Sequence, residues 1–242
     1  VYDIIARARR ATDEQEPTLL RMLMSARDEH SGEAMSDRQL RDEIITHYVA
    51  GHETTALVLT WTLYFLDRHP EIAAKVVEEI RSVCATDSPT LEQLDQLVYT
   101  RMVLDEVMRL RPPVWVQTRV TYEEDTLLGH TIPADSVVLL SSFFCHRHPD
   151  FWDEPEAFRP ERFLPEAVKQ RHRYAHFPFS AGPRACIGKR FAVYEASLAL
   201  ALVLGRYRLD VLPGQSIGMK VTATCHPDRP ILFRVAENRA RA

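Results

Sequence analysis

The chain has 242 residues and a formal net charge of −4 at pH 7, and its 45% hydrophobic and 26% charged residues are ordinary for a soluble globular protein. The slightly acidic balance excludes a general nucleic-acid binder, which usually carries a net basic surface. The longest stretch free of charge, Thr54 to Leu66, is shorter than the roughly 20 apolar residues that span a bilayer, so no membrane segment is expected.

Helical patterns dominate the first half of the chain. Residues 1–10 read as the continuation of an amphipathic helix, and a short helix is expected within 17–30. A capping box of Ser36 and Gln39 then opens a helix that continues without proline to His69, on the order of 50 Å long. Further helices are expected over 70–83 and 99–110, with a second capping box, Thr90 with Gln93, before a short helical turn between them.

The second half alternates strands with one more long helix. Strands are expected over 114–120 and 137–140, with a turn at 128–130 between them, and again over 206–211 and 231–235. A helix from Lys189 to a C-terminal cap at Gly205 is hydrophobic almost all round and should be buried. The fold class expected is therefore mainly α with small β-sheets.

The cysteines are scattered, without a C-x-x-C pair, so neither a zinc site nor a disulfide framework is expected, and a reducing compartment is favoured. They are Cys84, Cys145, Cys186 and Cys225. Cys186 lies just before the helix at Lys189, where free backbone N–H groups and the helix dipole favour a negative sulfur. Gly182 and Gly188 would let the backbone approach something large and flat. The alternative for a lone cysteine is a small buried hydrophobic residue.

The loop around Cys186 fits the spacing F-x-x-G-x-R-x-C-x-G, which Ala192 continues. The matching residues are Phe179, Gly182, Arg184, Cys186 and Gly188. In this loop the chain resembles the cytochrome P-450 superfamily, whose haem iron is held by a cysteine thiolate. The resemblance implies haem b with Cys186 as the axial iron ligand, a propionate contact from Arg184, and the ring of Phe179 packed near the sulfur.

A second motif interrupts the long helix with polar residues at 50–55, Ala-Gly-His-Glu-Thr-Thr. Glycine costs a helix interior about 1 kcal/mol relative to alanine, and threonine can bend the axis. A solvated polar stripe is one reading. The other is a resemblance to the family signature A-G-x-[DE]-T-[TS], in which Ala50 and Gly51 lie beside the haem, Thr54 hydrogen-bonds the oxygen on the iron, and Glu53 relays protons to it.

Three charged residues complete the resemblance. Glu106 and Arg109 are three residues apart and face the same side of a helix, where an exposed pair would contribute little. Arg162 belongs to a Pro-Glu-Arg-Phe segment like that of the family. The resemblance implies that the three form a buried, structural ion triad that locks the Cys186 loop, and such a pair is costly to break.

Other residues have weaker assignments. By resemblance, Arg119 is a second propionate contact. The substrate pocket or, alternatively, the core would contain Val114, Trp115 and Val116, and by resemblance the turn near Thr224 and Cys225 would be a minor pocket contact. His146 and His148 suggest a loop with satisfied histidines and no metal site. The basic run over 169–176, with Lys189 and Arg190, reads either as solvated surface or as a positive face for an acidic electron donor.

The function expected from the resemblance is a haem-thiolate monooxygenase that inserts one oxygen atom from O2 into a lipophilic small molecule. Its electrons would come from NAD(P)H through a ferredoxin, flavodoxin or reductase-type donor. A haem-thiolate peroxide isomerase or dehydratase is disfavoured by the intact Glu53–Thr54 pair, and a truncated non-catalytic haem-binding fragment stays open. Residues 1–242 would be the C-terminal portion of a single catalytic domain without its N-terminal half, closest to bacterial members and hence cytoplasmic.

Overall fold

The computed structural model describes residues 1–10, 18–84 and 88–238. In this part of the chain the structure is mainly helical, with small antiparallel sheets of two strands each, so the expected fold class is confirmed. The residues group into two compact units, 1–53 and 54–242, and the boundary falls inside one long helix, α3. None of the helices in the described ranges is both long and apolar enough to cross a membrane.

The first unit contains α1 (Tyr2–Arg10), α2 (Leu19–Ser25) and the beginning of α3. The helix expected within 17–30 is shorter than predicted, and Pro17 lies outside the described residues. Thr18 caps α2 by accepting the N–H of Arg21. Beyond the helix, the Asp28 carboxylate accepts the N–H groups of His30 and Ser31 at 3.0 and 2.8 Å. This side-chain turn competes with a further helical turn and explains the early end.

Helix α3 (Asp37–Arg68) has the predicted extent to within one residue at each end. The expected capping box is present, because the Ser36 N–H donates to Gln39 Oε1 at 2.9 Å and the Gln39 N–H donates to Ser36 Oγ at 3.3 Å. The polar segment 50–55 is helical throughout. Toward the C-terminal end, apolar side chains of α3 such as Val58 and Trp61 enter the main core.

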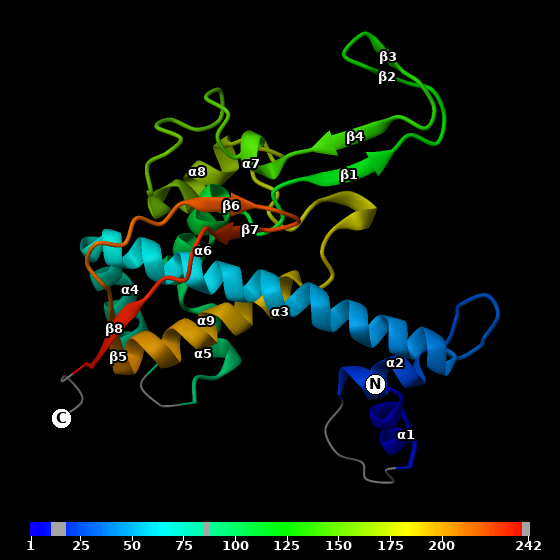
Figure 1. Ribbon diagram of the computed structural model, residues 1–242, viewed down its shortest axis with the longest axis horizontal. Helices are drawn as coiled ribbons and strands as arrows, with labels where there is room; N and C mark the ends of the chain where they lie inside the picture. The colour runs from blue at the N-terminus through cyan, green and yellow to red at the C-terminus, as the bar shows by residue number, and fades with distance from the viewer. Residues whose placement is uncertain (11–17, 85–87, 239–242) are drawn as a thin grey trace. The chain divides into compact units, whose positions relative to one another are not determined.

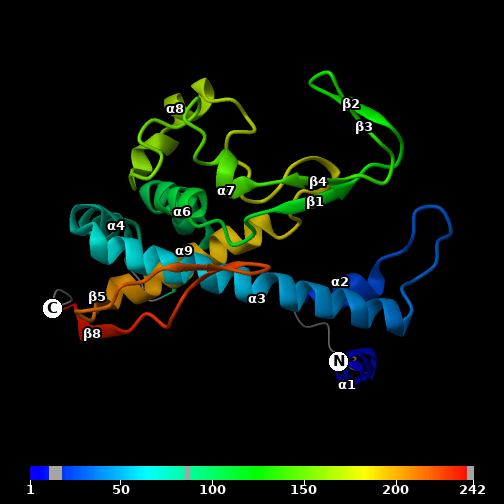
Figure 2. The same ribbon diagram turned by 45° about the horizontal axis from the view of Figure 1, so that its top comes forward.

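The core of the second unit is built from helices. Besides the end of α3, it contains α4 (Pro70–Val83), α5 (Leu91–Asp95), α6 (Val98–Leu110) and α9 (Lys189–Arg206). Figures 1 and 2 both show α4 and α9 beside the C-terminal half of α3. Representative buried members are Trp61, Val76, Ile80, Val103, Val107 and Leu200. The predicted Thr90–Gln93 capping box begins α5.

The start of α6 is closed by the carboxylate of Glu79 from α4. Its two oxygens accept the N–H of Tyr99 at 2.6 Å, the N–H of Thr100 at 2.8 Å and the hydroxyl of Thr100 at 2.7 Å. An anion at a helix N-terminus satisfies free N–H groups and opposes the positive end of the dipole. This contact fixes α6, the helix that carries Glu106 and Arg109, against α4.

Helix α9 is buried along much of its length, as predicted, but the expected cap at Gly205 is wrong. Gly205 lies inside the helix, and the extended Tyr207 (φ −126°) ends it. A Cβ at Gly205 would lie 3.7 Å from Ile80 Cγ2, so this glycine sits where α9 packs closely on α4. Glycine is common just after the last residue of a helix, so the sequence favoured a cap at Gly205. The close packing of α9 on α4, which is the reason for a glycine at this position, cannot be recognised from the sequence.

The strands pair into ribbons, and the ribbons within residues 117–140 extend away from the helices (Figures 1 and 2). β1 (Gln117–Val120) pairs with β4 (Val137–Leu140), and β2 (Asp125–Leu127) pairs with β3 (His130–Ile132). Leu128 and Gly129 connect β2 to β3 with φ values of 51° and 81°, which suits a tight two-residue hairpin turn. The other pairs are β5 (Tyr207–Val211) with β8 (Phe233–Glu237), and β6 (Met219–Val221) with β7 (Cys225–Pro227).

The strand expected over 114–120 begins only at Gln117. The carbonyls of Val114 and Trp115 are taken by α7 (Ser142–Cys145) and its cap instead: Ser142 Oγ donates to Val114 at 2.8 Å and Ser141 Oγ donates to Trp115 at 3.0 Å. Side-chain hydroxyls thus replace a strand partner. The connection to α9 contains three short helices, η1 (Pro160–Phe163), α8 (Pro165–Gln170) and η2 (Gly182–Arg184).

Candidate functional site

The loop from Phe177 to Lys189 is closed by its own backbone. The Cys186 N–H donates to the Phe179 carbonyl at 2.8 Å, and the Ser180 N–H donates to the Phe177 carbonyl at 3.0 Å. Two residues have left-handed backbone angles, Ser180 (φ 62°) and Gly182 (φ 69°). These bonds hold Cys186 immediately before α9, with an exposed side chain that forms no disulfide.

The two glycines of the loop have different roles. Gly182 requires a positive φ that L residues adopt only at a cost, although a Cβ there would meet nothing within 4 Å. Gly188 has an ordinary φ of −83°, and a Cβ there would lie 3.9 Å from Cys186 Sγ. Gly182 therefore shapes the loop, while Gly188 keeps the space beside the sulfur open.

Apolar and cationic side chains lie near Cys186 in the sequence, and Arg119 joins its loop from a strand. Ile187 and Phe191 are 90% and 71% exposed, which is unusual for large apolar residues. Arg184 is exposed, and Arg119 reaches the loop from β1, with Nη2 3.5 Å from Ser180 Oγ. Phe179 is half-buried and packs against the main core, with Lys189 Nζ 5.8 Å from its ring.

These residues fit one kind of ligand. An accessible thiol suits a soft metal, and among the described residues no group of three or more His, Cys, Asp or Glu side chains could complete a metal site. Uncovered apolar side chains suit a flat apolar ring system, and two guanidinium groups suit carboxylates at its edge. Haem has all three properties, so the residues present fit the expected cofactor.

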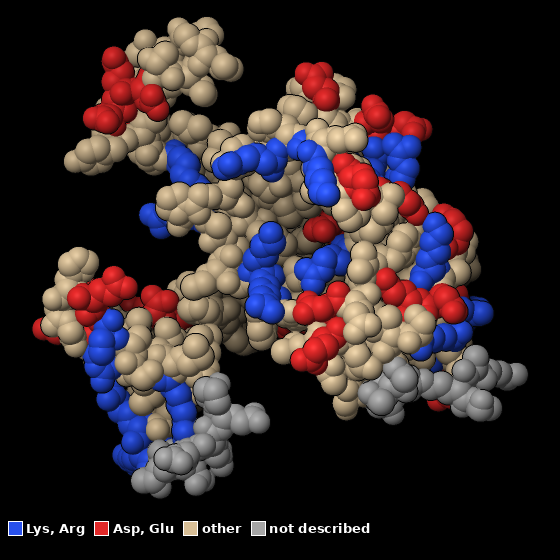
Figure 3. Space-filling view, turned by 180° about the vertical axis from the view of Figure 1, so that it is seen from behind, with Lys and Arg blue, Asp and Glu red and all other residues tan. Residues whose placement is uncertain are grey.

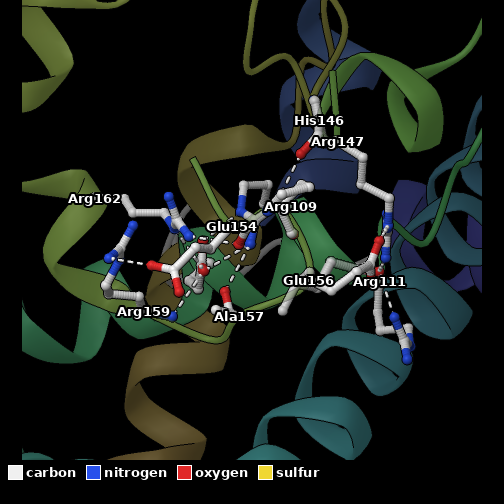
Figure 4. Close-up of polar contacts among 12 residues, drawn as sticks. Arg109, Arg111, His146, Arg147, Glu154, Glu156, Ala157, Arg159 and Arg162 are labelled. Carbon is white, nitrogen blue, oxygen red and sulfur yellow. Dashed lines mark hydrogen bonds and ion pairs between the residues drawn. The ribbon is translucent and has the colours of Figure 1, made fainter. Parts of the chain in front are cut away.

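Glu106 and Arg109 form a fully buried ion pair on α6. Arg109 Nε donates to Glu106 Oε2 at 2.6 Å and Arg109 Nη2 donates to Oε1 at 2.8 Å, with both side chains 0% exposed. The remaining donors bind the backbone carbonyls of His146, Pro155 and Ala157 at 2.9, 2.6 and 3.1 Å. Figure 4 shows the Arg109 side chain between His146 and Ala157. All five N–H donors of the guanidinium thus have acceptors.

The structure also brings Arg162 to this pair. Arg162 Nε lies 3.5 Å from Glu106 Oε1, and Nη2 donates to the Glu154 carbonyl at 2.8 Å. The Arg159 N–H donates to the same Glu106 oxygen at 2.8 Å. Burial lowers the pKa of Arg162, and the Glu106 carboxylate opposes this shift. One carboxylate therefore ties α6 to the segment that contains η1.

His146 was not predicted as part of the site. Its side chain is 0% exposed, and its Nε2 accepts the N–H of Phe177 at 2.9 Å. Burial lowers the pKa of His146 to about 3, with further lowering from Arg109 and Arg147, so the ring is neutral at physiological pH. Local sequence gives no signal for this contact, because its partner is 31 residues away.

The polar segment of α3 is divided by the boundary between the two units. Ala50 and Gly51 are exposed, Glu53 and Thr54 are half-buried, and Thr55 is buried. Ala50, Gly51 and Glu53 belong to the first unit and Thr54 to the second. That these residues lie opposite Cys186 stays a prediction.

The expected pocket residues divide into two groups. Val114, Trp115 and Val116 are half-buried, with Trp115 Nε1 donating to the Thr222 carbonyl at 2.8 Å. Cys225 is 0% exposed, and its backbone bonds to Trp61 Nε1 at 3.2 Å and to the Pro113 carbonyl at 3.0 Å. Burial raises the pKa of the Cys225 thiol to about 11.

Thr224 is also buried, with Oγ1 2.6 Å from His226 Nε2. Thr224 and Cys225 are therefore both buried, and their expected contact with the substrate pocket stays a prediction.

The basic run over 169–176 is only partly a surface. Arg171 donates to the Arg162 carbonyl and lies over the Trp152 ring, 4.0 Å from its centroid. The ring of His176 packs against His146 at 4.8 Å, and burial holds the pKa of His176 well below its ordinary value. Exposed members are Lys169, His172, Arg173, Lys189 and Arg190. On the face shown in Figure 3, basic side chains gather with acidic ones among them.

The comparisons with known proteins identify the family of the chain. The sequence pattern of the family described as Cytochrome P450 matches residues 2–233, and the chain belongs to this family. It is 40% identical over 199 residues to cyclooctatin synthase of Streptomyces melanosporofaciens, covering 82% of this chain and 43% of that protein. It is 36% identical to pentalenene oxygenase of Streptomyces avermitilis, covering 97% of this chain and 52% of that one.

A solved structure gives the same result. The haem domain of cytochrome P450DA superposes with a TM-score of 0.91 and 32% identity, over 98% of this chain and 52% of that one. The chain thus spans about half the length of the relatives and the solved structure that it matches. These matches show the family and the fold of the chain, and they confirm the resemblance seen in the sequence.

Proposed function

We propose that the whole protein is a haem-thiolate monooxygenase that inserts one oxygen atom from O2 into a lipophilic small organic substrate. The proposal is carried by the exposed Cys186 thiol at the end of a hydrogen-bonded loop to which Arg119 of β1 also reaches. When bound, haem b supplies the iron at which O2 is activated, and a thiolate ligand favours O–O cleavage. The cytochrome P450 family of the chain supports this reading.

The residues of the loop would hold the cofactor. Cys186 would bind the haem iron through its thiolate, while Arg184 and Arg119 would bind the propionates with charge-assisted hydrogen bonds. Gly182 shapes the loop, Gly188 leaves room beside the sulfur, and the Phe179 ring supports the loop from the core side.

Two residues of α3 would manage protons. The Thr54 hydroxyl would donate a hydrogen bond where O2 is activated, and the Glu53 carboxylate would pass protons inward from water. Both side chains are half-buried, which suits groups that connect solvent with an interior site. Ala50 and Gly51, beside them in the helix, would border the oxygen site.

The substrate and the electron supply are proposed from weaker observations. Pentalenene oxygenase is named for the oxygenation of pentalenene, and a lipophilic substrate here would pack against Val114, Trp115 and Val116. Electrons would derive from NAD(P)H through a ferredoxin, flavodoxin or reductase-type donor. Exposed Lys189 and Arg190 at the start of α9 would attract an acidic surface of that donor.

Residues 1–242 would form the C-terminal portion of one catalytic domain. Five curated relatives, among them the two described above, are matched over 41% to 52% of their lengths, which fits this organisation. A peroxide isomerase or dehydratase is the second candidate, and it would need neither an electron donor nor O2.

The decisive experiment is the spectrum of the reduced, carbon-monoxide-bound whole protein. A strongly red-shifted Soret band that is lost in Cys186→Ser but kept in Cys145→Ser is expected, because only Cys186 would bind iron. Cys145 is a suitable control, since it is another cysteine without a disulfide. An unshifted band in the unaltered protein would refute thiolate ligation. Product formation without an electron donor would favour the isomerase or dehydratase instead.

A further inference from the structure

His146 connects the buried ion pair to the cysteine loop. Its backbone carbonyl accepts a hydrogen bond from Arg109 Nη1 at 2.9 Å, and its side-chain Nε2 accepts the Phe177 N–H at 2.9 Å. Phe177 is the residue at which the loop begins, and its carbonyl accepts the Ser180 N–H. One hydrogen bond to the backbone of His146 and one to its side chain thus join α6 to the loop that contains Cys186.

The imidazole can make this contact in only one state. Nε2 accepts a hydrogen bond, so its lone pair must be free and the proton must be on Nδ1. The surroundings favour this neutral form, because burial, followed by the charges of Arg109 and Arg147, disfavours a positive charge on the ring. The backbone at Met108 and Arg109 opposes this lowering of the pKa, but Nδ1 makes no hydrogen bond of normal geometry within the described part of the chain.

Aromatic packing fixes the ring itself. The rings of His146 and Phe177 meet edge to face at a centroid distance of 5.2 Å, and His176 lies 4.8 Å from His146 on another side. The ring therefore has little freedom to turn away from Phe177, and the acceptor stays directed at the first N–H of the loop.

We propose that His146 is a positioning residue for the Cys186 loop: its neutral imidazole anchors Phe177 and thereby fixes the sulfur relative to the ligand that it binds. The inference rests on the proposed function for the nature of that ligand. The contact between His146 and the loop does not depend on that ligand. The backbone hydrogen bonds of the loop connect Phe177 to Ser180 and Phe179 to Cys186.

The test compares two substitutions in the whole haem-loaded protein. His146→Phe keeps a ring of similar shape and removes the acceptor, whereas His146→Gln keeps an acceptor near the position of Nε2. His148→Phe is the matched control, because His148 is an exposed histidine two residues away. The readouts are amide hydrogen exchange over residues 177–186 and the Soret position of the reduced, carbon-monoxide-bound form.

The expected result is faster exchange at Phe177 in His146→Phe, by roughly 10- to 100-fold, since a buried N–H loses its acceptor. A fraction of the protein should also lose the red-shifted band. His146→Gln should restore both, and His148→Phe should change neither. Unaltered exchange at Phe177 in His146→Phe, or faster exchange with an intact red-shifted population, would overturn the positioning role.

Failure of the proposed function would look different. The unaltered protein would then lack the red-shifted band, while the exchange at Phe177 would still depend on the acceptor at position 146. If His146→Phe does not fold, the tautomer in the unaltered protein decides the matter by nitrogen NMR of labelled histidine. An unprotonated Nε2 at neutral pH supports the anchor, and a protonated Nε2 refutes it.

Discussion

Arg109 donates to the backbone carbonyl of His146 at 2.9 Å, while the side chain of the same histidine receives the first N–H of the cysteine loop. Arg109 in turn is held by two bonds to Glu106. A buried ion pair on one helix is thereby connected, through one intervening residue, to the backbone that carries Cys186. A change at Glu106 or Arg109 is therefore expected to reach the loop that carries Cys186, although neither residue belongs to that loop.

Removing the Glu106 charge is expected to destabilise the protein strongly. Glu106→Gln leaves Arg109 buried without its counter-charge, and breaking such a pair costs about 3–5 kcal/mol. The free energy of unfolding from denaturant titration is the measurement. Glu154→Gln is the control, because its ion pair with Arg159 is largely exposed and should contribute little. Similar losses in the two variants would contradict this account of Glu106.

Much of the fold could be predicted because it depends on local chemistry. The capping boxes at Ser36 and Thr90 and the extent of α3 follow from residues three or four apart, and the spacing of Glu106 and Arg109 places them on one helix face. The family resemblance was confirmed because the loop motif is also local.

The features of the fold and the site that could not be predicted depend on contacts between residues far apart in the sequence. The Phe177 contact of His146 and the Ile80 contact of Gly205 join residues far apart in the chain. Arg171 looked like a surface charge, yet the Trp152 ring and the Arg162 carbonyl draw its guanidinium inward. Neither the ring faces nor the free carbonyls that make such burial favourable can be read from the sequence.

Acid is expected to destabilise the protein through His146 and His176. Burial lowers the pKa of both rings in the folded state, to about 3 for His146. In the unfolded chain the two histidines have the ordinary pKa of 6.5, so below this pH the unfolded state binds more protons than the folded state. Stability should be complete above about pH 6.5 and fall with decreasing pH, by about 1.4 kcal/mol per pH unit for each ring. The measurement is the unfolding free energy between pH 7 and pH 4.

Asp105 opposes this trend. Burial raises its pKa to about 6, so the folded protein binds the extra proton, and its contribution is complete below pH 3.8 and lost as the pH rises through 6. Asp105→Asn should therefore steepen the loss of stability below pH 6, and His146→Gln should reduce it. A profile that is flat between pH 6 and pH 4 in Asp105→Asn would contradict the assignment of the two histidines.

Thr54→Ala tests the proton role of α3. The variant should keep the cofactor and the red-shifted spectrum, because Thr54 makes no bond to the Cys186 loop in its proposed role. The share of electrons recovered in product should fall and peroxide release should rise, since a hydrogen-bond donor is lost where protons are delivered. Thr60→Ala, six residues further along α3, is the control, because its hydroxyl bonds to the Ala56 carbonyl at 2.8 Å. Unchanged coupling in Thr54→Ala would count against the assigned role.

The glycines at 51 and 182 should respond in opposite directions to alanine. Gly51 is helical and a Cβ there meets nothing within 4 Å in the described chain, so Gly51→Ala should raise the unfolding free energy of the cofactor-free protein by about 0.5–1 kcal/mol. Gly182→Ala should lower it by about 1 kcal/mol, because φ is 69°. Both values come from denaturant titration.

Gly51→Ala has a second outcome that separates the two readings of the polar segment. If Gly51 borders the oxygen site, the added methyl group should weaken carbon monoxide binding to the reduced protein although the chain itself is more stable. A solvated stripe predicts the gain in stability with unchanged carbon monoxide affinity. Ala50→Gly, the reverse change at the neighbouring exposed position, controls for helix propensity and should lower stability by a similar amount.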